Sequence, residues 1–78
     1  MYLYKSPVGD IYICRNSDGY GIYFGGIFYS GCPTAEACAD DVYTQSTGID
    51  VWDQYIPRPG EYIPSDLSGW TFIRRPLR

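Results

Sequence analysis

The stretch Gly31–Gly48, GCPTAEACADDVYTQSTG, carries the clearest helical signal in the 78-residue sequence. Thr34 is a suitable N-cap, because its hydroxyl can accept a hydrogen bond from an unpaired N–H group of the first turn. A helix is therefore expected to begin at Ala35, with Gly48 as its left-handed stop. Small apolar side chains recur along it at helical spacing: Ala35, Cys38, Ala39 and Val42. This narrow stripe predicts a helix that lies close against a sheet.

The residues before this helix alternate in the manner of β-strands. Strands are expected at four places: Met1–Lys5, Ile11–Arg15, Tyr20–Phe24 and Ile27–Ser30. We expect turns at Ser6–Asp10 and at Asn16–Gly19, the second because of its Asp-Gly pair. The third turn is the two-residue loop Gly25-Gly26, which sets the register of the last two strands. The pairs across that register are Phe24 with Ile27, Tyr23 with Phe28 and Ile22 with Tyr29.

Alternate residues of a strand point to opposite faces of a sheet, so this register predicts two faces. The face toward the helix is expected to carry Tyr20, Ile22, Phe24, Ile27 and Tyr29. The other face is aromatic and is expected to carry Tyr12, Tyr23 and Phe28, with Tyr2 and Tyr4 of the first strand. A second aromatic face on so small a sheet must be covered by the C-terminal segment or used for binding.

The C-terminal half, residues 49–78, contains four prolines and little periodicity, so we expect it to be irregular. Asp50 is expected to cap a single turn over Val51–Tyr55, and Trp70–Ile73 alternates like a short final strand. Residues 74–78 form a basic tail that is expected to fray. The fold class predicted is α+β, with an antiparallel β-meander of three to four strands packed on one α-helix. Residues 1–78 form a single domain in this interpretation.

The charge is unevenly distributed along the chain. The formal net charge is −3, yet no Lys or Arg occurs between Asn16 and Pro57. That segment contains six carboxylates: Asp18, Glu36, Asp40, Asp41, Asp50 and Asp53. A solvated face is the simplest explanation of such a run. An acidic run without a local counter-ion also favours a surface that repels nucleic acid and attracts a basic partner.

Elimination argues against catalysis. The chain has no histidine, which removes Ser-His-Asp and Cys-His sites and leaves no zinc set for its three cysteines. We interpret Cys14, Cys32 and Cys38 as reduced, small apolar residues. Asp40 and Asp41 project about 100° apart on a helix, so they cannot act on one substrate as an acid–base pair. We therefore expect no enzyme activity, no metal and no cofactor.

No stretch of the sequence is apolar enough for a transmembrane helix, and the N-terminus lacks a basic-then-apolar leader pattern. The expected location is the cytoplasm. Direct binding of nucleic acid is disfavoured, because the predicted strands and helix carry the acids. Two alternatives stay open: a single-stranded RNA binder that stacks bases on Tyr12, Tyr23 and Phe28, and a self-assembling structural or accessory protein that buries its aromatic face in a homodimer.

Three stretches together resemble a group of small proteins encoded in bacterial and prophage genomes: Tyr4–Ile13 (YKSPVGDIYI), Thr34–Gly48 (TAEACADDVYTQSTG) and Pro64–Ile73 (PSDLSGWTFI). The three stretches are distributed over most of the chain, from residue 4 to residue 73, and the resemblance implies a fold rather than a chemistry. The chain is also similar in kind to the anti-CRISPR proteins. That similarity implies a small, acidic α+β inhibitor whose carboxylates stand in for nucleic-acid phosphates on a basic partner.

The hypothesis from the sequence is a non-enzymatic, protein-binding module, a phage-encoded inhibitor that blocks a nucleic-acid-binding surface of a host defence complex. Carboxylates would complement the charge of a basic partner, and neighbouring aromatic side chains would anchor it. The predicted partner-binding residues are Glu36, Asp40, Asp41, Tyr43, Asp50, Trp52, Asp53 and Tyr55.

Overall fold

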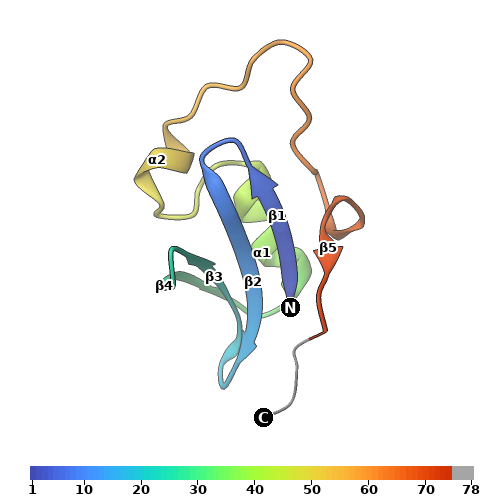
Figure 1. Ribbon diagram of the computed structural model, residues 1–78. Helices are drawn as coiled ribbons and strands as arrows, with labels where there is room; N and C mark the ends of the chain where they lie inside the picture. The colour runs from blue at the N-terminus through green and yellow to red at the C-terminus, as the bar shows by residue number, and fades with distance from the viewer. Residues whose placement is uncertain (75–78) are drawn as a thin grey trace.

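Four consecutive strands form an antiparallel meander, and a short fifth strand extends it at one edge (Figure 1). The computed structural model describes residues 1–74, in which the sheet order is β4-β3-β2-β1-β5. The strands are β1 (Tyr2–Ser6), β2 (Gly9–Asn16), β3 (Gly19–Phe24), β4 (Ile27–Cys32) and β5 (Thr71–Phe72). The helical elements are α1 (Ala35–Tyr43), α2 (Asp50–Asp53) and the 3-10 turn η1 (Leu67–Gly69). The predicted α+β meander packed on a helix is confirmed.

The β3–β4 hairpin turns at Gly25-Gly26, where both residues have positive φ angles of 60° and 78°. The predicted pairs Phe24–Ile27 and Tyr23–Phe28 are confirmed. The third predicted pair is wrong, because a β-bulge shifts the register and Ile22 lies opposite Ser30 instead of Tyr29. Ile27 also departs from its predicted place in the core, since 56% of its surface is exposed at the end of the sheet.

Tyr2 and Tyr4 lie on the core side of the sheet, so their predicted place on the outer aromatic face is wrong. Ser6 pairs directly with Gly9, so the connection is shorter than the predicted Ser6–Asp10 turn. Tyr4 therefore lies opposite the buried Ile11, and both tyrosines pack on the core side of the sheet. A register change of one residue moves every side chain of a strand to the other face.

Helix α1 begins as predicted, and its apolar stripe is buried. The Thr34 side chain accepts a hydrogen bond from the Ala37 N–H at 3.1 Å. The predicted stop at Gly48 is wrong, because the helix ends at Tyr43 and Gln45 takes the left-handed conformation with φ 55°. Gln45 is held there by its own side chain, whose Nε2 donates to the carbonyl oxygens of Trp52 at 2.8 Å and Tyr55 at 2.6 Å.

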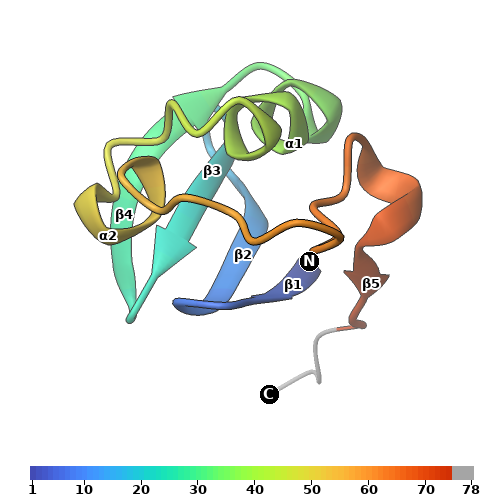
Figure 2. The ribbon, with the colours of Figure 1, turned by 90° about the horizontal axis from the view of Figure 1, so that it is seen from above.

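The chain beyond α1 returns over the helix side of the sheet (Figure 2). Ile49, Trp52 and Trp70 join the core there, beside Ile13 and Ile22 of the sheet. The described C-terminal segment therefore adds to the helical layer, and no helix of residues 1–74 lies on the opposite face of the sheet (Figure 2). Of the predicted frayed tail, Arg74 is exposed, and residues 75–78 lie outside the described residues. No helix within residues 1–74 is long and apolar enough to span a membrane.

Candidate interaction surfaces

Helices α1 and α2 present carboxylates to solvent on the helical side of the molecule. Glu36, Asp40 and Tyr43 follow one another at helical spacing and are all exposed. Asp50 and Val51 are exposed on α2, which covers the same face of the sheet. We call these five residues the acidic helical surface. Within residues 1–74 the one ion pair joins Lys5 Nζ to Asp10 Oδ2 at 3.9 Å, so no described cation pairs with these acids.

Asp41 and Asp53 were predicted to contact a partner, but the structure turns both toward the protein. The partly buried Asp41 carboxylate accepts a hydrogen bond from the Cys32 thiol at 3.6 Å. Asp53 accepts from the Thr47 N–H, the Thr47 hydroxyl and the Gly48 N–H at 2.8 to 3.1 Å. The predicted capping residue of this turn, Asp50, makes no side-chain capping bond. Asp53 thus closes the 47–53 segment, and the capping prediction for Asp50 is wrong.

The two predicted aromatic anchors Trp52 and Tyr55 also have structural roles. Trp52 is fully buried, its Nε1 donates to the Val42 carbonyl oxygen at 2.9 Å, and its ring stacks on Tyr55 at 5.8 Å. A buried side chain cannot contact a partner, so Trp52 is removed from the predicted set. The Tyr55 hydroxyl is engaged as well, because it donates to Glu61 Oε1 at 2.6 Å. Among the three aromatic residues predicted to bind a partner, Tyr43 is the exposed one, with 48% of its surface accessible.

A Pro-rich loop, residues 54–66, projects from one end of the molecule and is braced at its tip (Figure 1). Glu61 Oε1 accepts from Tyr55 and from the Arg58 N–H at 3.0 Å, while the Glu61 N–H donates back to the Arg58 carbonyl oxygen. The Tyr55 bond and then the Arg58 N–H lower the pKa of the Glu61 carboxyl, and the same tyrosine–carboxylate bond raises the pKa of Tyr55. Ile56 and Tyr62 are exposed beside this tip, at 85% and 68%.

The outer face of the sheet carries the predicted aromatic row. Tyr12, Tyr23 and Phe28 lie side by side on β2, β3 and β4, with Leu3 on β1. Phe28 meets Tyr23 edge-on, at 5.5 Å and 61°, so these two rings form no flat stacking platform. A shallow groove of about 400 Å³ runs along this face beside Tyr12 and Tyr23, with Arg15 on its wall. The face therefore offers apolar contact area with little charge.

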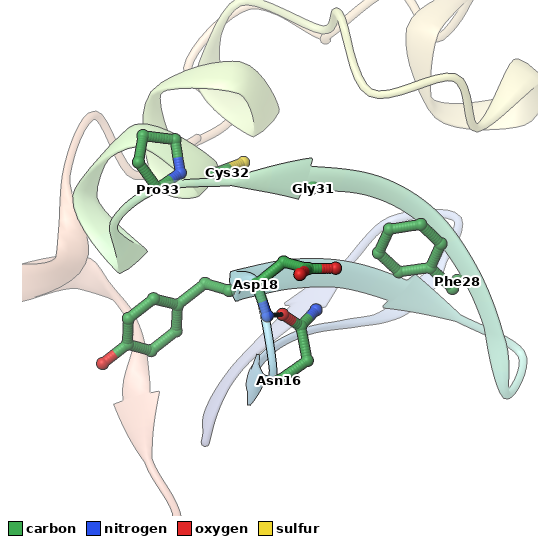
Figure 3. Close-up of a pocket in the computed structure, with 7 residues that line it drawn as sticks. Asn16, Asp18, Phe28, Gly31, Cys32 and Pro33 are labelled. Carbon is green, nitrogen blue, oxygen red and sulfur yellow. Dashed lines mark hydrogen bonds between the residues drawn. The ribbon is translucent and has the colours of Figure 1, made fainter.

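A second hollow of about 330 Å³ lies between the β2–β3 turn and the end of β4. Figure 3 shows the Asp18 carboxylate projecting from the turn toward the Phe28 ring, beneath Gly31. The Asp18 N–H donates to Asn16 Oδ1 at 2.9 Å, which holds the turn. Pro33, just before α1, lines the same hollow. This site was missed from the sequence, where Asp18 was part of the acidic run and Asp18-Gly19 indicated a turn.

The described residues include no group of three or more His, Cys, Asp or Glu side chains that could hold a metal ion. Cys32 and Cys38 are buried, and burial raises the pKa of both thiols, so each stays protonated and weakly nucleophilic. Comparison with known proteins adds nothing to this chemistry, since no family model, curated protein or solved structure matches the chain.

Proposed function

We propose that this protein is a non-enzymatic binding module whose acidic helical surface docks on a basic surface of a partner protein. The observation that carries the proposal is the exposure of Glu36, Asp40 and Asp50 on one layer without a paired cation in residues 1–74. Two exposed apolar side chains, Tyr43 and Val51, lie among these acids, at 48% and 57% exposure. Charge then steers the encounter, and the apolar side chains lose their contact with water on docking.

The partner class we propose is a nucleic-acid-binding protein of a host defence complex, with the module acting in the cytoplasm as a competitor of nucleic acid. Such proteins carry basic surfaces shaped for phosphates, and exposed carboxylates can occupy the same sites. This proposal keeps the resemblance to prophage-encoded and anti-CRISPR proteins as its guide to the target. It replaces the predicted contact set by Glu36, Asp40, Tyr43, Asp50 and Val51.

The test is capture of partners from a nuclease-treated host lysate at low and moderate salt by the tagged wild-type chain and by Asp40→Asn/Asp50→Asn. We expect the wild type to retain a basic, nucleic-acid-binding protein in stoichiometric amount, and the double variant to lose most of it. Wild-type capture should fall from low to moderate salt, and the difference between the two chains should narrow, because interactions between exposed charges more than about 10 Å apart are largely screened at 0.1 M. Added nucleic acid should release the captured protein.

The matched control is Asp10→Lys, which changes the net charge by the same amount as the double variant. Asp10 lies opposite Lys5 in the β1–β2 hairpin and outside the helical layer. Capture by this variant should equal that of the wild type. The proposal fails if the Asp40/Asp50 variant captures the same protein as well as the wild type does.

Self-association through the outer sheet face is a second candidate, favoured by the aromatic row on that face: Phe28, 52% exposed on the edge strand β4, and the partly buried Tyr12 and Tyr23 beside it. A homodimer that buries them would show a mass that rises with concentration in light scattering, and Phe28→Glu would lower it. A strictly monomeric wild type over the micromolar to millimolar range would remove this candidate.

A further inference from the structure

The shape of the hollow beside the β2–β3 turn depends on the glycine at position 21, which has no side chain. Gly21 lies opposite Gly31, and a Cβ on Gly21 would come within 2.7 Å of the Phe28 ring. The ring therefore lies over the glycine, in edge contact with Tyr23, and forms one wall of the hollow. An aromatic wall at this place needs glycine at position 21, because any larger residue would push the ring away.

The opposite side of the hollow carries a carboxylate. Asp18 is exposed, and within the described residues its side chain has neither an ion pair nor a hydrogen bond. Its backbone is fixed by the bond to Asn16 and by the close packing of Gly19, where a Cβ would come within 2.7 Å of the Cys32 carbonyl oxygen. The carboxylate is thus held at the rim and points toward the Phe28 ring (Figure 3).

An organic cation in this hollow would meet a carboxylate on one side and an aromatic ring on the other, and both attract positive charge. A guanidinium group satisfies both walls at once, because it pairs with a carboxylate through two parallel N–H donors and stacks on an aromatic ring. An ammonium group is strongly hydrated and uses the ring less well. We propose that this hollow binds the guanidinium of an arginine side chain from a partner protein.

The position of the hollow connects it with the acidic helical surface. Pro33 lines it and is followed at once by Thr34, the N-cap of α1, so the hollow lies at the helix end that carries Glu36. The identity of the partner rests on the proposed function, whereas the chemistry of the hollow does not. The hollow gives a basic partner one defined contact, and the exposed acids supply the general attraction.

The first experiment is an NMR titration of the full chain with Nα-acetyl-arginine methylamide. The amides of Asp18, Gly19, Gly31 and Phe28 should shift together, with half-saturation at roughly millimolar concentration, as expected for one partly exposed ion pair and one ring. The citrulline analogue has nearly the same shape without the charge and should cause no shift. The lysine analogue should bind more weakly than the arginine probe.

Two variants test the walls separately. Asp18→Asn keeps a turn-compatible Asn-Gly pair, so the fold should be retained while binding falls about tenfold, as for loss of a charged partner. Phe28→Leu should weaken binding severalfold. Asp10→Asn removes the same charge elsewhere and should leave the titration unchanged. Equal shifts with the citrulline analogue, or wild-type affinity in Asp18→Asn, would overturn the arginine site.

The two proposals fail independently. If the arginine probe does not bind but Asp40→Asn/Asp50→Asn loses the captured protein, the acidic helical surface stands and the arginine site falls. If the probe binds and Asp18→Asn loses the captured protein while the double variant keeps it, the hollow is the docking site and the helical surface is not.

Discussion

At the residue scale, two aspartates three positions apart in one short helix have different tasks. Asp50 projects into water without a capping bond, whereas Asp53 reaches back to three donors on Thr47 and Gly48. Thr47 is 2% exposed, so its N–H and hydroxyl need partners inside the protein. Its hydroxyl also accepts from the Ile49 N–H at 3.0 Å, which completes a local network. The free acid is a candidate for binding, and the engaged acid is a structural residue.

Substitution of these two aspartates should separate the roles. Asp53→Ala leaves donors on Thr47 and Gly48 unpaired and should lower the free energy of unfolding by about 3 kcal/mol. Asp50→Ala removes no described bond and should change it by less than about 0.5 kcal/mol. Urea denaturation followed by tryptophan fluorescence measures both values, because Trp52 is buried beside this segment. Equal losses in the two variants would show that the Asp53 network does not hold the segment.

At the element scale, the 54–66 loop depends on a bond between two of its own side chains. Its tip contains Arg58-Pro59-Gly60-Glu61, with Gly60 at φ 82°, and the Glu61 carboxylate binds both Tyr55 and the Arg58 N–H. These bonds are made by the ionised carboxylate, which is why its pKa is lowered. The charge on Glu61 therefore controls how firmly the tip is held.

The tip should respond to acid in one direction. Because the pKa of Glu61 is lower in the folded protein, its contribution is present above the usual carboxyl range and is lost as the pH falls through the lowered pKa. NMR titration of the Tyr55 ring and the Glu61 side chain should show both changing together, at a pH below the usual range of a glutamate carboxyl. Glu61→Gln still accepts a hydrogen bond but cannot titrate, so it should remove the step. A Glu61 that titrates at or above the usual value would contradict this account.

At the scale of the whole molecule, both halves of the chain contribute to the core. The half up to Gly48 has a regular pattern of strands and a helix, whereas the half from Ile49 onward is irregular. The regular half supplies Ile11, Ile13 and Ile22 from the sheet and the small stripe of α1. The irregular half supplies Trp52 and Trp70, whose rings lie 5.8 Å and 5.5 Å from the ring of Tyr4. These two tryptophans fill the space that a helix of small side chains leaves above the sheet.

The regular half alone should therefore fail to fold. A chain ending at Gly48 retains four strands and α1 but loses Ile49, Trp52 and Trp70 from the core. Domains of such length are marginal even with a complete core, so we expect no cooperative urea transition by circular dichroism. A chain ending at Arg74 keeps every described contact and is the control. A sigmoidal transition in the short chain would contradict a core shared between the halves.

The sequence by itself determined the features that neighbouring residues control. The Gly25-Gly26 turn, the Thr34 cap and the stripe on α1 depend on backbone conformation and helical periodicity within a few residues, and each is confirmed. The acidic run was visible too, because charge is read directly from composition. These features were enough to predict the α+β class. Of the eight predicted contact residues, four are exposed in the structure: Glu36, Asp40, Tyr43 and Asp50.

Only the tertiary structure decided the features that depend on contacts between distant segments. The face of Tyr2 and Tyr4 changed with a register difference of one residue in the first hairpin, and the β4 bulge shifted Ile22 from Tyr29 to Ser30. The burial of Trp52 and the engagement of Asp53 depend on segments that meet only after folding. The Asp18–Phe28 hollow follows the same rule, because one wall comes from the β2–β3 turn and the other from β4, and local patterns cannot show that the two meet.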